Sequence, residues 1–299
     1  MTDTAPDQPS SLDLSVIIPA YNEEGAIGPE IDHLHQALGG SGIRYELVVV
    51  DDGSSDRTAE IAAGKDCRLL RQGRNRGYGA ALKRGISDAQ AELIAITDAD
   101  GTYPPEALPE LFRLAAENDM VIASRTGEKV HIPLLRRPAK WFLRVLASWL
   151  SGTRIPDLNS GMRIMRRSTV RRFAHILPPG FSFTTTITLA VLTTHGTVHW
   201  HPINYGKRLG TSKIRASHAW EFTLLILRVI VLFNPLKVFL PLGLVLFLAG
   251  AAKFAYDVTK DNLSESAVMA ILGAIIIWSL GLLADQNSRL GLDRETWPR

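Results

Sequence analysis

The stretch Leu93-Ile94-Ala95-Ile96-Thr97-Asp98-Ala99-Asp100-Gly101 carries the feature that decides the fold. A short apolar run, the length of a buried strand, ends in two aspartates separated by one small residue. In an open α/β sheet ligands collect at the carboxyl ends of the strands, so these carboxylates lie where a ligand would bind. Two adjacent negative charges repel unless a cation lies beside them, and oxygen ligands suit Mg²⁺ or Mn²⁺. The alternative is a strand end followed by a plain turn, because Asp and Gly are both turn residues.

Strands and helices alternate on both sides of this stretch. The sequence predicts strands at 14–19, 45–50, 68–70, 93–97 and 120–125, and helices at 26–38, 58–65, 79–89 and 105–117. Such alternation is typical of an α/β fold with a doubly wound, mostly parallel sheet. Acidic residues follow three of the strands, namely Glu23, Asp51 with Asp52, and Asp98 with Asp100. The sheet is therefore expected to have an acidic edge.

The familiar phosphate-binding loops are missing from this sequence. Ala20-Tyr21-Asn22-Glu23 stands where a dinucleotide-binding protein has its glycine fingerprint, and Gly77-Tyr78-Gly79 lacks the third glycine. No G-x-x-x-x-G-K-[ST] loop is found either. A bound diphosphate would then need a metal ion with scattered Lys and Arg, and Lys83 is one candidate; the alternative is a surface lysine.

Composition divides the chain into unlike parts. The 299 residues carry a net charge of +3 and are 46% hydrophobic, but the residues from 222 onward are much more apolar than the rest. A single cysteine, Cys67, rules out an internal disulfide and fits a reducing compartment. The polar, acidic start indicates a disordered tail without a signal peptide. The expected divisions are a tail at 1–13, an α/β domain at 14–214, a juxtamembrane helix at 215–235, a transmembrane hairpin at 236–286 and a tail at 287–299.

Two apolar stretches, 236–258 and 266–284, are each long enough to cross a bilayer. The loop between them is mainly acidic, whereas basic residues flank both outer ends: Arg215, Arg228, Lys237, Arg289, Arg294 and Arg299. Because basic residues stay on the cytoplasmic side, both ends and the α/β domain are expected there, at the inner membrane. A soluble helical hairpin is the alternative.

Other segments suggest contact with the membrane surface. Residues 140–150 mix Trp, Leu and Arg, and residues 220–233 are apolar but short, so both are predicted to be interfacial helices; the first could instead pack on the sheet. Lys207-Arg208-Leu209-Gly210-Thr211-Ser212-Lys213 offers three cations for a lipid phosphate. A further basic cluster is either a solvated helix face or a contact for acidic lipid: Arg163, Arg166, Arg167, Arg171 and Arg172. His199 and His201 share a strand face without a nearby Cys or carboxylate, so zinc is not expected.

With these segments assembled, the chain resembles the family-2 glycosyltransferases of GT-A fold, and among them the polyprenyl-phosphate glycosyltransferases of the dolichol-phosphate mannose synthase type. The resemblance covers residues 14–284 and depends on five motifs in order: Val16-Ile17-Ile18-Pro19-Ala20-Tyr21-Asn22-Glu23-Glu24, Val50-Asp51-Asp52-Gly53-Ser54, Asp98-Ala99-Asp100, Asn159-Ser160-Gly161-Met162-Arg163 and Gly210-Thr211-Ser212-Lys213.

The resemblance implies a role for each matching residue. Pro19, Tyr21, Glu23 and Asp52 would bind the nucleoside, and Asp98 and Ala99 the sugar nucleotide. Asp100 would hold Mg²⁺ or Mn²⁺ together with Asp98. The phosphates of donor or acceptor would be met by Arg125, Arg163, Arg208 and Lys213, with Lys207 an alternative to Arg208. Relatives often carry Gln two residues after the second Asp; Thr102 stands there, so Thr102 or water would complete the metal ligands.

The expected reaction is inverting transfer of one sugar from a nucleotide-sugar donor to a polyprenyl phosphate acceptor. The phosphate is already an anion and can attack without a strong base, while the metal and the cations neutralise the charge. The Gln-x-x-Arg-Trp signature of processive members is absent. Two alternatives stay open: a catalytically silent, membrane-anchored nucleotide-binding scaffold, and a transferase acting on another lipid or a soluble acceptor. Nucleic acid is not an expected partner, and a homo-oligomer is possible.

Overall fold

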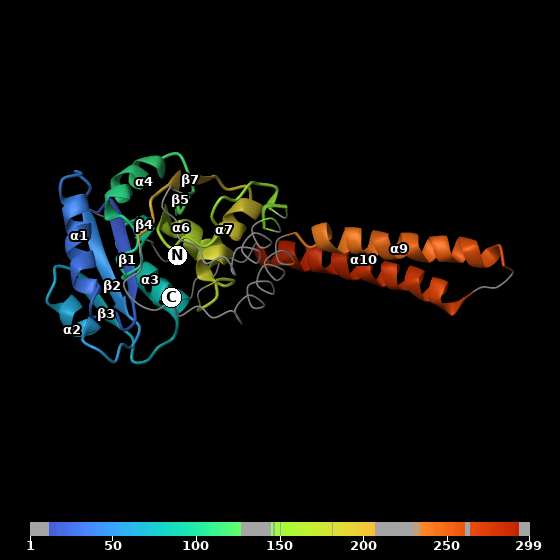
Figure 1. Cartoon of the computed structure of the whole chain (residues 1–299), viewed down its shortest axis with the longest axis horizontal. Helices are drawn as coiled ribbons and strands as arrows, with labels where there is room; N and C mark the ends of the chain where they lie inside the picture. The colour runs from blue at the N-terminus through green and yellow to red at the C-terminus, as the bar shows by residue number, and fades with distance from the viewer. Residues whose placement is uncertain are drawn as a thin grey trace, which may run out of the picture.

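The computed structural model describes residues 12–126, 145, 147–149, 151–180, 182–206, 231, 234–260 and 264–292, without the side chains of 289–292. An α/β unit forms one end of the molecule, and a hairpin of the helices α9 (Leu236–Val258) and α10 (Glu265–Leu292) projects from it (Figure 1). Most of the expected tail at 1–13, most of the two predicted interfacial helices and the basic stretch at 207–213 lie outside the described residues.

In the described part of the chain, seven strands form a single sheet in the order β3-β2-β1-β4-β6-β5-β7. They are β1 (Leu14–Ala20), β2 (Tyr45–Asp51), β3 (Arg68–Arg71), β4 (Leu93–Ile96), β5 (Met120–Ser124), β6 (Arg163–Arg166) and β7 (Val198–Pro202). β6 runs antiparallel to both β4 and β5, and the other neighbouring pairs are parallel. This is the mostly parallel α/β fold that the sequence predicts.

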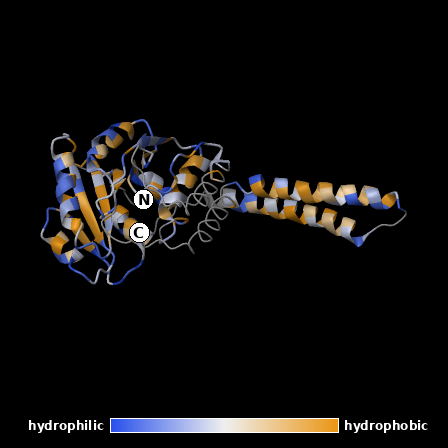
Figure 2. Ribbon diagram, in the orientation of Figure 1, coloured by the Kyte–Doolittle hydropathy of each residue, from blue (hydrophilic) through white to orange (hydrophobic). Residues whose placement is uncertain are grey.

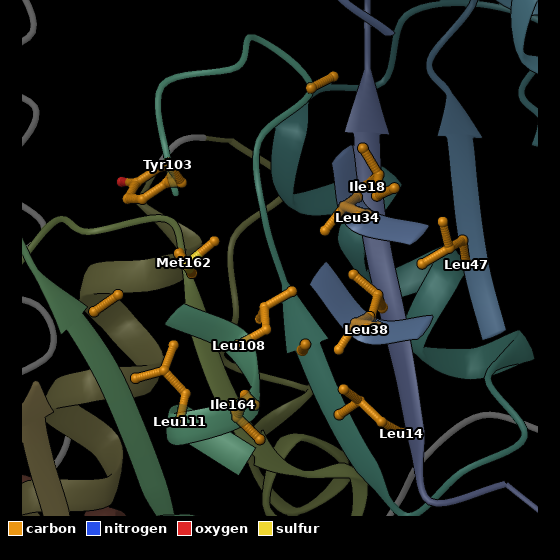
Figure 3. Close-up of a cluster of buried hydrophobic side chains, with 14 of the residues drawn as sticks. Leu14, Ile18, Leu34, Leu38, Leu47, Tyr103, Leu108, Leu111, Met162 and Ile164 are labelled. Carbon is orange, nitrogen blue, oxygen red and sulfur yellow. The ribbon is translucent and has the colours of Figure 1, made fainter. Parts of the chain in front are cut away.

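Helices cover both faces of the sheet. One face carries α1 (Ile27–Gly39), α2 (Thr58–Ala63) and α4 (Leu108–Leu114), the last preceded by a 3₁₀ turn η1 (Pro105–Ala107); the other carries α3 (Tyr78–Asp88), α6 (Arg167–Phe173) and α7 (Phe183–Thr193). Figure 3 shows the first of the two cores, in which Ile18 of β1, Leu34 of α1 and Leu108 of α4 all take part. Because both faces are covered, β1 is buried over its whole length and is apolar except at Ser15.

The site lies where the strand order reverses. β1 has β2 on one side and β4 on the other, and all three run parallel. A crevice for a ligand forms outside the carboxyl ends of strands at such a reversal. The loops that follow β1 and β4 are the Tyr21–Glu24 and Thr97–Thr102 segments.

The hairpin is held together by close approach at small residues. A Cβ placed on Gly281 would lie 2.6 Å from Phe239 Cβ, and one on Gly243 would overlap the Trp278 ring. Most of the remaining surface is exposed and apolar (Figure 2), as at Val245, which is 68% exposed. Both helices are long and apolar enough to cross a membrane, and little of either is buried. An apolar surface that protein leaves uncovered suggests membrane anchoring.

Two helices depart from the sequence prediction by more than one residue at an end. α2 ends at Ala63 rather than at 65, because Gly64 caps it. The predicted helix at 105–117 begins as the 3₁₀ turn at Pro105–Ala107 and stops at Leu114. Prolines at the start favour such a turn, because they supply no N–H to the helix.

Candidate functional site

The loops after β1 and β2 are joined by hydrogen bonds. The Asn22 backbone N–H donates to Ser54 Oγ at 3.0 Å, and the Glu23 N–H donates to Thr58 Oγ1 at 2.8 Å. Asn22 has φ of 53°, a left-handed conformation that asparagine tolerates. The two loops that carry the predicted nucleoside residues therefore form one connected surface.

Asp52 anchors the start of α3. Its Oδ1 and Oδ2 accept hydrogen bonds from the backbone N–H groups of Arg76 and Gly77, both at 2.8 Å, and the residue is 3% exposed. Next to it, Gly53 has φ of 73°, and a Cβ there would lie 2.7 Å from the Arg74 carbonyl carbon. The carboxylate is thus engaged with the backbone, and its predicted contact with the nucleoside stays a prediction.

Asp100 lies in the turn after β4, only 4% exposed. Its Oδ1 accepts hydrogen bonds from the Thr102 hydroxyl at 2.6 Å and from the Thr102 backbone N–H at 3.2 Å. Gly101, between them, has φ of 68°, which glycine adopts without strain. Thr102 therefore orients Asp100 in this structure; its role as a metal ligand stays a prediction.

Asp98 lies between two segments that are distant in the sequence. Its Oδ1 accepts a 3.0 Å hydrogen bond from the Tyr78 hydroxyl at the start of α3. On its other side is Gly161, where a Cβ would lie 2.8 Å from Asp98 Oδ2. The neighbouring Ala99 is buried, and Asp98 itself is half-buried.

Tyr103 ties the β4 turn to the loop before β6. Its hydroxyl accepts a 2.6 Å hydrogen bond from the Gly161 backbone N–H, and its ring meets Tyr205 edge-on with centroids 5.1 Å apart. The Gly206 N–H also donates to the Thr102 carbonyl at 2.9 Å. The segment that leaves β7 is therefore bonded to the turn that carries the two aspartates.

Glu30, on α1, is a buried carboxyl beside this turn. Burial, together with the negative charges of Asp100, Asp98 and Glu106, raises the pKa of Glu30 to about 8. It is 1% exposed, and its Oε1 has no hydrogen-bond partner among the described residues. Three carboxylates therefore lie close enough to Glu30 to disfavour its ionisation.

Arg125 and Asp157 form a two-point ion pair. Arg125 Nε lies 2.7 Å from Asp157 Oδ2 and Nη2 lies 2.9 Å from Oδ1, while the guanidinium also stacks over Tyr205 at 5.4 Å. Burial alone would raise the pKa of Asp157, but the hydrogen bonds from Arg125 lower it. Arg125 is thus held near the β4 turn through Tyr205 and Tyr103.

Arg163 is fully buried and faces α7. Its guanidinium donates to the Thr184 carbonyl at 3.0 Å, to Thr188 Oγ1 at 2.9 Å and to the Ser160 carbonyl. Burial lowers the pKa of Arg163 to about 10. The structure does not bring this side chain to the surface, so binding a phosphate would require it to leave these partners.

The remaining predicted residues have varied positions. The Lys83 ammonium donates to the carbonyls of Ala174 at 3.1 Å and Leu177 at 2.5 Å, so it joins α3 to the end of α6 and is neither a plain surface lysine nor directed at the β4 turn. Its binding of the nucleotide stays a prediction. Pro19 is buried in β1, and Tyr21 follows, half-buried. Arg208 and Lys213 lie outside the described residues.

The oxygen groups at the turn fit a divalent cation of a particular kind. Within the described ranges, no three His, Cys, Asp or Glu side chains form a group that could enclose a metal. Asp98 and Asp100 instead suit an ion that takes most of its ligands from phosphate and water, as Mg²⁺ commonly does. After burial, the charges of Asp100 and Asp98 are the next causes of the raised pKa of Glu30, so both aspartates act on their surroundings as negative charges, which such an ion would offset.

Sequence reasoning missed four residues of the site: Glu30, Tyr78, Tyr103 and Asp157. Glu30 had a signal, because it lies three residues after Ile27 on the apolar face of α1. Gly77 and Gly79, on either side of Tyr78, resemble an incomplete dinucleotide motif in the sequence. In the structure a Cβ on Gly77 would lie 2.7 Å from the Pro179 carbonyl oxygen, so these glycines allow the loop that contains Pro179 to pack against the start of α3.

With this geometry established, comparison with known proteins gives the class. Residues 15–173 match glycosyl transferase family 2, and the chain belongs to that family. It is a glycosyltransferase. Residues 234–290 match a second family, the GtrB C-terminal hairpin, which corresponds to α9 and α10.

Three relatives illustrate the similarity. The dolichyl-phosphate hexose transferase of Haloferax volcanii is 33% identical over 204 residues, 68% of this chain and 86% of the relative. The dodecaprenyl-phosphate galacturonate synthase of Rhizobium johnstonii is 30% identical over 174 residues, 56% and 51% of the two chains. The undecaprenyl-phosphate 4-deoxy-4-formamido-L-arabinose transferase of Pseudomonas paraeruginosa is 34% identical over 170 residues, 54% and 50%. The match spans about half the length of the last two.

Solved structures share the fold. The glucosyl-3-phosphoglycerate synthase of Mycobacterium tuberculosis, in complex with Mn²⁺, UDP and phosphoglyceric acid, superposes with a TM-score of 0.59 at 20% identity, over 74% of this chain and 79% of that one. The same enzyme with Mg²⁺ and UDP gives 0.56 at 20% identity, over 73% and 79%. These distant GT-A-like neighbours bind Mn²⁺ or Mg²⁺.

Proposed function

We propose that this protein transfers one sugar from a nucleotide-sugar donor to the phosphate of a polyprenyl phosphate at the cytoplasmic face of the inner membrane. The observation that carries the proposal is the hydrogen bond from Gly206 to Thr102. It joins the turn of Asp98 and Asp100 to the chain just before the basic stretch 207–213 and the apolar hairpin. The turn proposed to bind the donor is thus bonded to the part of the chain that leads on, in sequence, to the apolar hairpin.

The relatives support the acceptor. Those described above are named for sugar transfer involving dolichyl, dodecaprenyl or undecaprenyl phosphate. Their shared chemical feature is a phosphate on a long isoprenoid, which an apolar hairpin and, in the sequence, the three cations of residues 207–213 would suit. The positive residues flanking the hairpin support the cytoplasmic orientation.

The donor would bind along the loops after β1, β2 and β4. Tyr21, Glu23 and Asp52, with Pro19 behind them, would line the nucleoside, and Asp98 would contact the sugar nucleotide. Asp100 would hold Mg²⁺ or Mn²⁺ in the orientation set by Thr102. When bound, the cation would neutralise the diphosphate and assist its departure.

The acceptor phosphate would then attack the anomeric carbon. A bond forms between a phosphate oxygen and that carbon, while the bond from the carbon to the nucleotide diphosphate breaks, so the anomeric configuration inverts. No base is needed, because the phosphate is already an anion. Arg125, with Arg208 and Lys213, would offset the repulsion between the two anionic substrates.

The test is transfer by the full chain in detergent. Radiolabelled UDP-glucose, UDP-galactose, UDP-N-acetylglucosamine and GDP-mannose are each supplied with undecaprenyl phosphate and Mg²⁺ or Mn²⁺, and label is measured in the organic extract. We expect one donor to give an extractable, acid-labile product. Nucleotide binding without product from any acceptor would support the silent scaffold, and label in diacylglycerol or a soluble acceptor alone would support the other transferase.

A further inference from the structure

We propose that Tyr78 and Gly161 hold the Asp98 carboxylate from two sides, and that this Asp98 seat sets how tightly the sugar end of the donor is bound. The inference rests on the proposed function, because it takes Asp98 as a ligand of the sugar nucleotide. Tyr78 and Gly161 are positioning residues in this account, since they act through Asp98.

The Tyr78 side of the seat is a hydrogen bond. The hydroxyl donates to Asp98 Oδ1 at 3.0 Å. Burial and the charge of Asp98 raise the pKa of Tyr78 well above its usual value, so the phenol keeps its proton and stays a donor. A hydrogen bond to an ionised acceptor is stronger than one between neutral groups.

The backbone on either side of Tyr78 is held in place by hydrogen bonds that do not involve Asp98. The Gly77 N–H bonds to Asp52 Oδ2 at 2.8 Å, and the Ala80 N–H bonds to the Pro179 carbonyl at 2.9 Å. A Cβ on Gly79 would overlap the Pro178 carbonyl oxygen, so the Pro178–Gly180 loop lies directly on the start of α3. The anchored backbone therefore sets the position of the Tyr78 hydroxyl, and this hydroxyl in turn helps to set the position of the Asp98 carboxylate.

The Gly161 side of the seat is contact. A Cβ at this position would lie 2.8 Å from Asp98 Oδ2 and 3.0 Å from Oδ1, closer than such atoms approach. The backbone there is held by the 2.6 Å hydrogen bond from the Gly161 N–H to the Tyr103 hydroxyl. Gly161 is not among the residues with positive φ, so glycine is needed here for its lack of a side chain and not for its backbone conformation.

A carboxylate confined in this way presents a fixed direction to its ligand. Binding of a sugar hydroxyl depends on that direction, whereas binding of the nucleoside depends on the loops after β1 and β2. Loss of the Asp98 seat is therefore expected to weaken a sugar nucleotide far more than the nucleotide alone. A general structural defect would weaken both.

The experiment compares Tyr78→Phe and Gly161→Ala with the wild-type full chain in detergent. Calorimetry in EDTA, which removes any cation shared by Asp98 and Asp100, gives Kd for UDP and UDP-glucose and for GDP and GDP-mannose. Kinetics with Mg²⁺ or Mn²⁺ give KM and kcat for whichever donor is used. We expect sugar-nucleotide Kd and KM to rise about 10-fold or more in Tyr78→Phe, the worth of a hydrogen bond to a charged group. Gly161→Ala should raise both as well, because its Cβ would displace the Asp98 carboxylate. Nucleotide Kd should stay within about 2-fold, and kcat should change less than KM.

Tyr45→Phe is the matched control. It also removes a tyrosine hydroxyl that is hydrogen-bonded at 2.8 Å, in this case to His35 Nδ1 at the opposite end of the sheet. Its sugar-nucleotide Kd should equal that of the wild type. Tyr78→Phe alone decides the case should Gly161→Ala fail to fold.

Two results would overturn the proposal: an unchanged sugar-nucleotide Kd in Tyr78→Phe, or an equal loss of affinity for nucleotide and sugar nucleotide. The seat and the proposed function can fail separately. A wild-type protein that transfers no sugar to undecaprenyl phosphate, while Tyr78→Phe still shows the difference between the two ligands, would refute the function and leave the seat standing.

Discussion

Arg125 and Asp157 orient each other at two points, with Nε–Oδ2 at 2.7 Å and Nη2–Oδ1 at 2.9 Å, and both side chains are largely buried. Trp200 donates its indole N–H to the Asp157 carbonyl at 3.2 Å, which fixes the loop that carries the acid. The cation expected to meet a phosphate is therefore already aligned by a carboxylate.

Breaking this pair should be costly. Asp157→Ala leaves a guanidinium that is only 20% exposed without its counter-charge, and we expect the free energy of unfolding to fall by about 3–5 kcal/mol. Denaturant titration of the detergent-solubilised protein measures the change. Glu110→Ala is the control, because its 2.7 Å pair with Arg113 is exposed and should leave stability unchanged. Equal stability of Asp157→Ala and wild type would contradict the argument.

The second prediction concerns the cation at the β4 turn. Asp100→Asn keeps the shape of the side chain but removes its charge, so sugar transfer should fall at least about 100-fold while the far-UV circular dichroism spectrum stays unchanged. The assay is the radiolabel extraction with Mg²⁺ or Mn²⁺ titrated over a wide range. Asp88→Asn, at a surface ion pair with Arg84, should keep full transfer. Full activity of Asp100→Asn would remove the metal role of this residue.

The third prediction is a pH dependence of stability. Burial raises the pKa of Glu30 from its usual 4.5 to about 8, so between these values the folded protein binds more protons than the unfolded chain. The contribution of Glu30 to the free energy of unfolding is thus most favourable below about pH 4.5, and it is lost as the pH rises towards 8. Asp100, Asp98 and Glu106 face the group and act in the same direction.

Glu30→Gln should remove this part of the pH dependence. The variant keeps the shape but cannot ionise, so at pH 9 we expect it to exceed the wild type in stability by about 1–3 kcal/mol. Unfolding is measured in EDTA from pH 5 to 9. Glu117→Gln, at an exposed position, should retain the wild-type slope. A wild-type slope in Glu30→Gln would show that Glu30 ionises freely.

The fourth prediction concerns the hairpin. A side chain on Gly243 would overlap the Trp278 indole, whose N–H donates to the Leu240 carbonyl at 3.2 Å. Gly243→Val should therefore force α9 and α10 apart and lower the unfolding free energy by about 1–3 kcal/mol. Thermal unfolding in detergent and in liposomes measures it. Gly273→Ala is the control, because its Cβ would meet only the end of the Leu246 side chain, at 3.2 Å. Similar losses in the two variants would count against close packing at Gly243.

The sheet could be predicted from the sequence because its strands are buried on both faces. Runs such as Leu47–Val50 are apolar without interruption, and the acidic residues that follow them mark the strand ends. The hairpin was equally plain, since two long apolar stretches have few other uses. The antiparallel direction of β6 could not be read, because direction depends on contacts with β4 and β5 rather than on local pattern.

The site was predicted in part, and the reason is distance along the chain. Asp98 and Asp100 could be picked out because they directly follow a predicted strand. The residues that contact Asp98 come from distant parts of the sequence: Tyr78 from α3 and Gly161 from the loop before β6. Arg163 shows the opposite error. An arginine after a polar turn suggests an exposed cation, yet α7 covers it and supplies carbonyl and hydroxyl acceptors.

The bond between Gly206 and Thr102 has a mechanical consequence. Thr102 accepts the Gly206 N–H through its carbonyl and donates through its hydroxyl to Asp100, so two consecutive hydrogen bonds connect the chain leaving β7 to the second aspartate. A displacement of that chain would reach Asp100 through these two hydrogen bonds alone. On the proposed function, Thr102 would couple binding of the acceptor by the stretch after Gly206 to the position of Asp100.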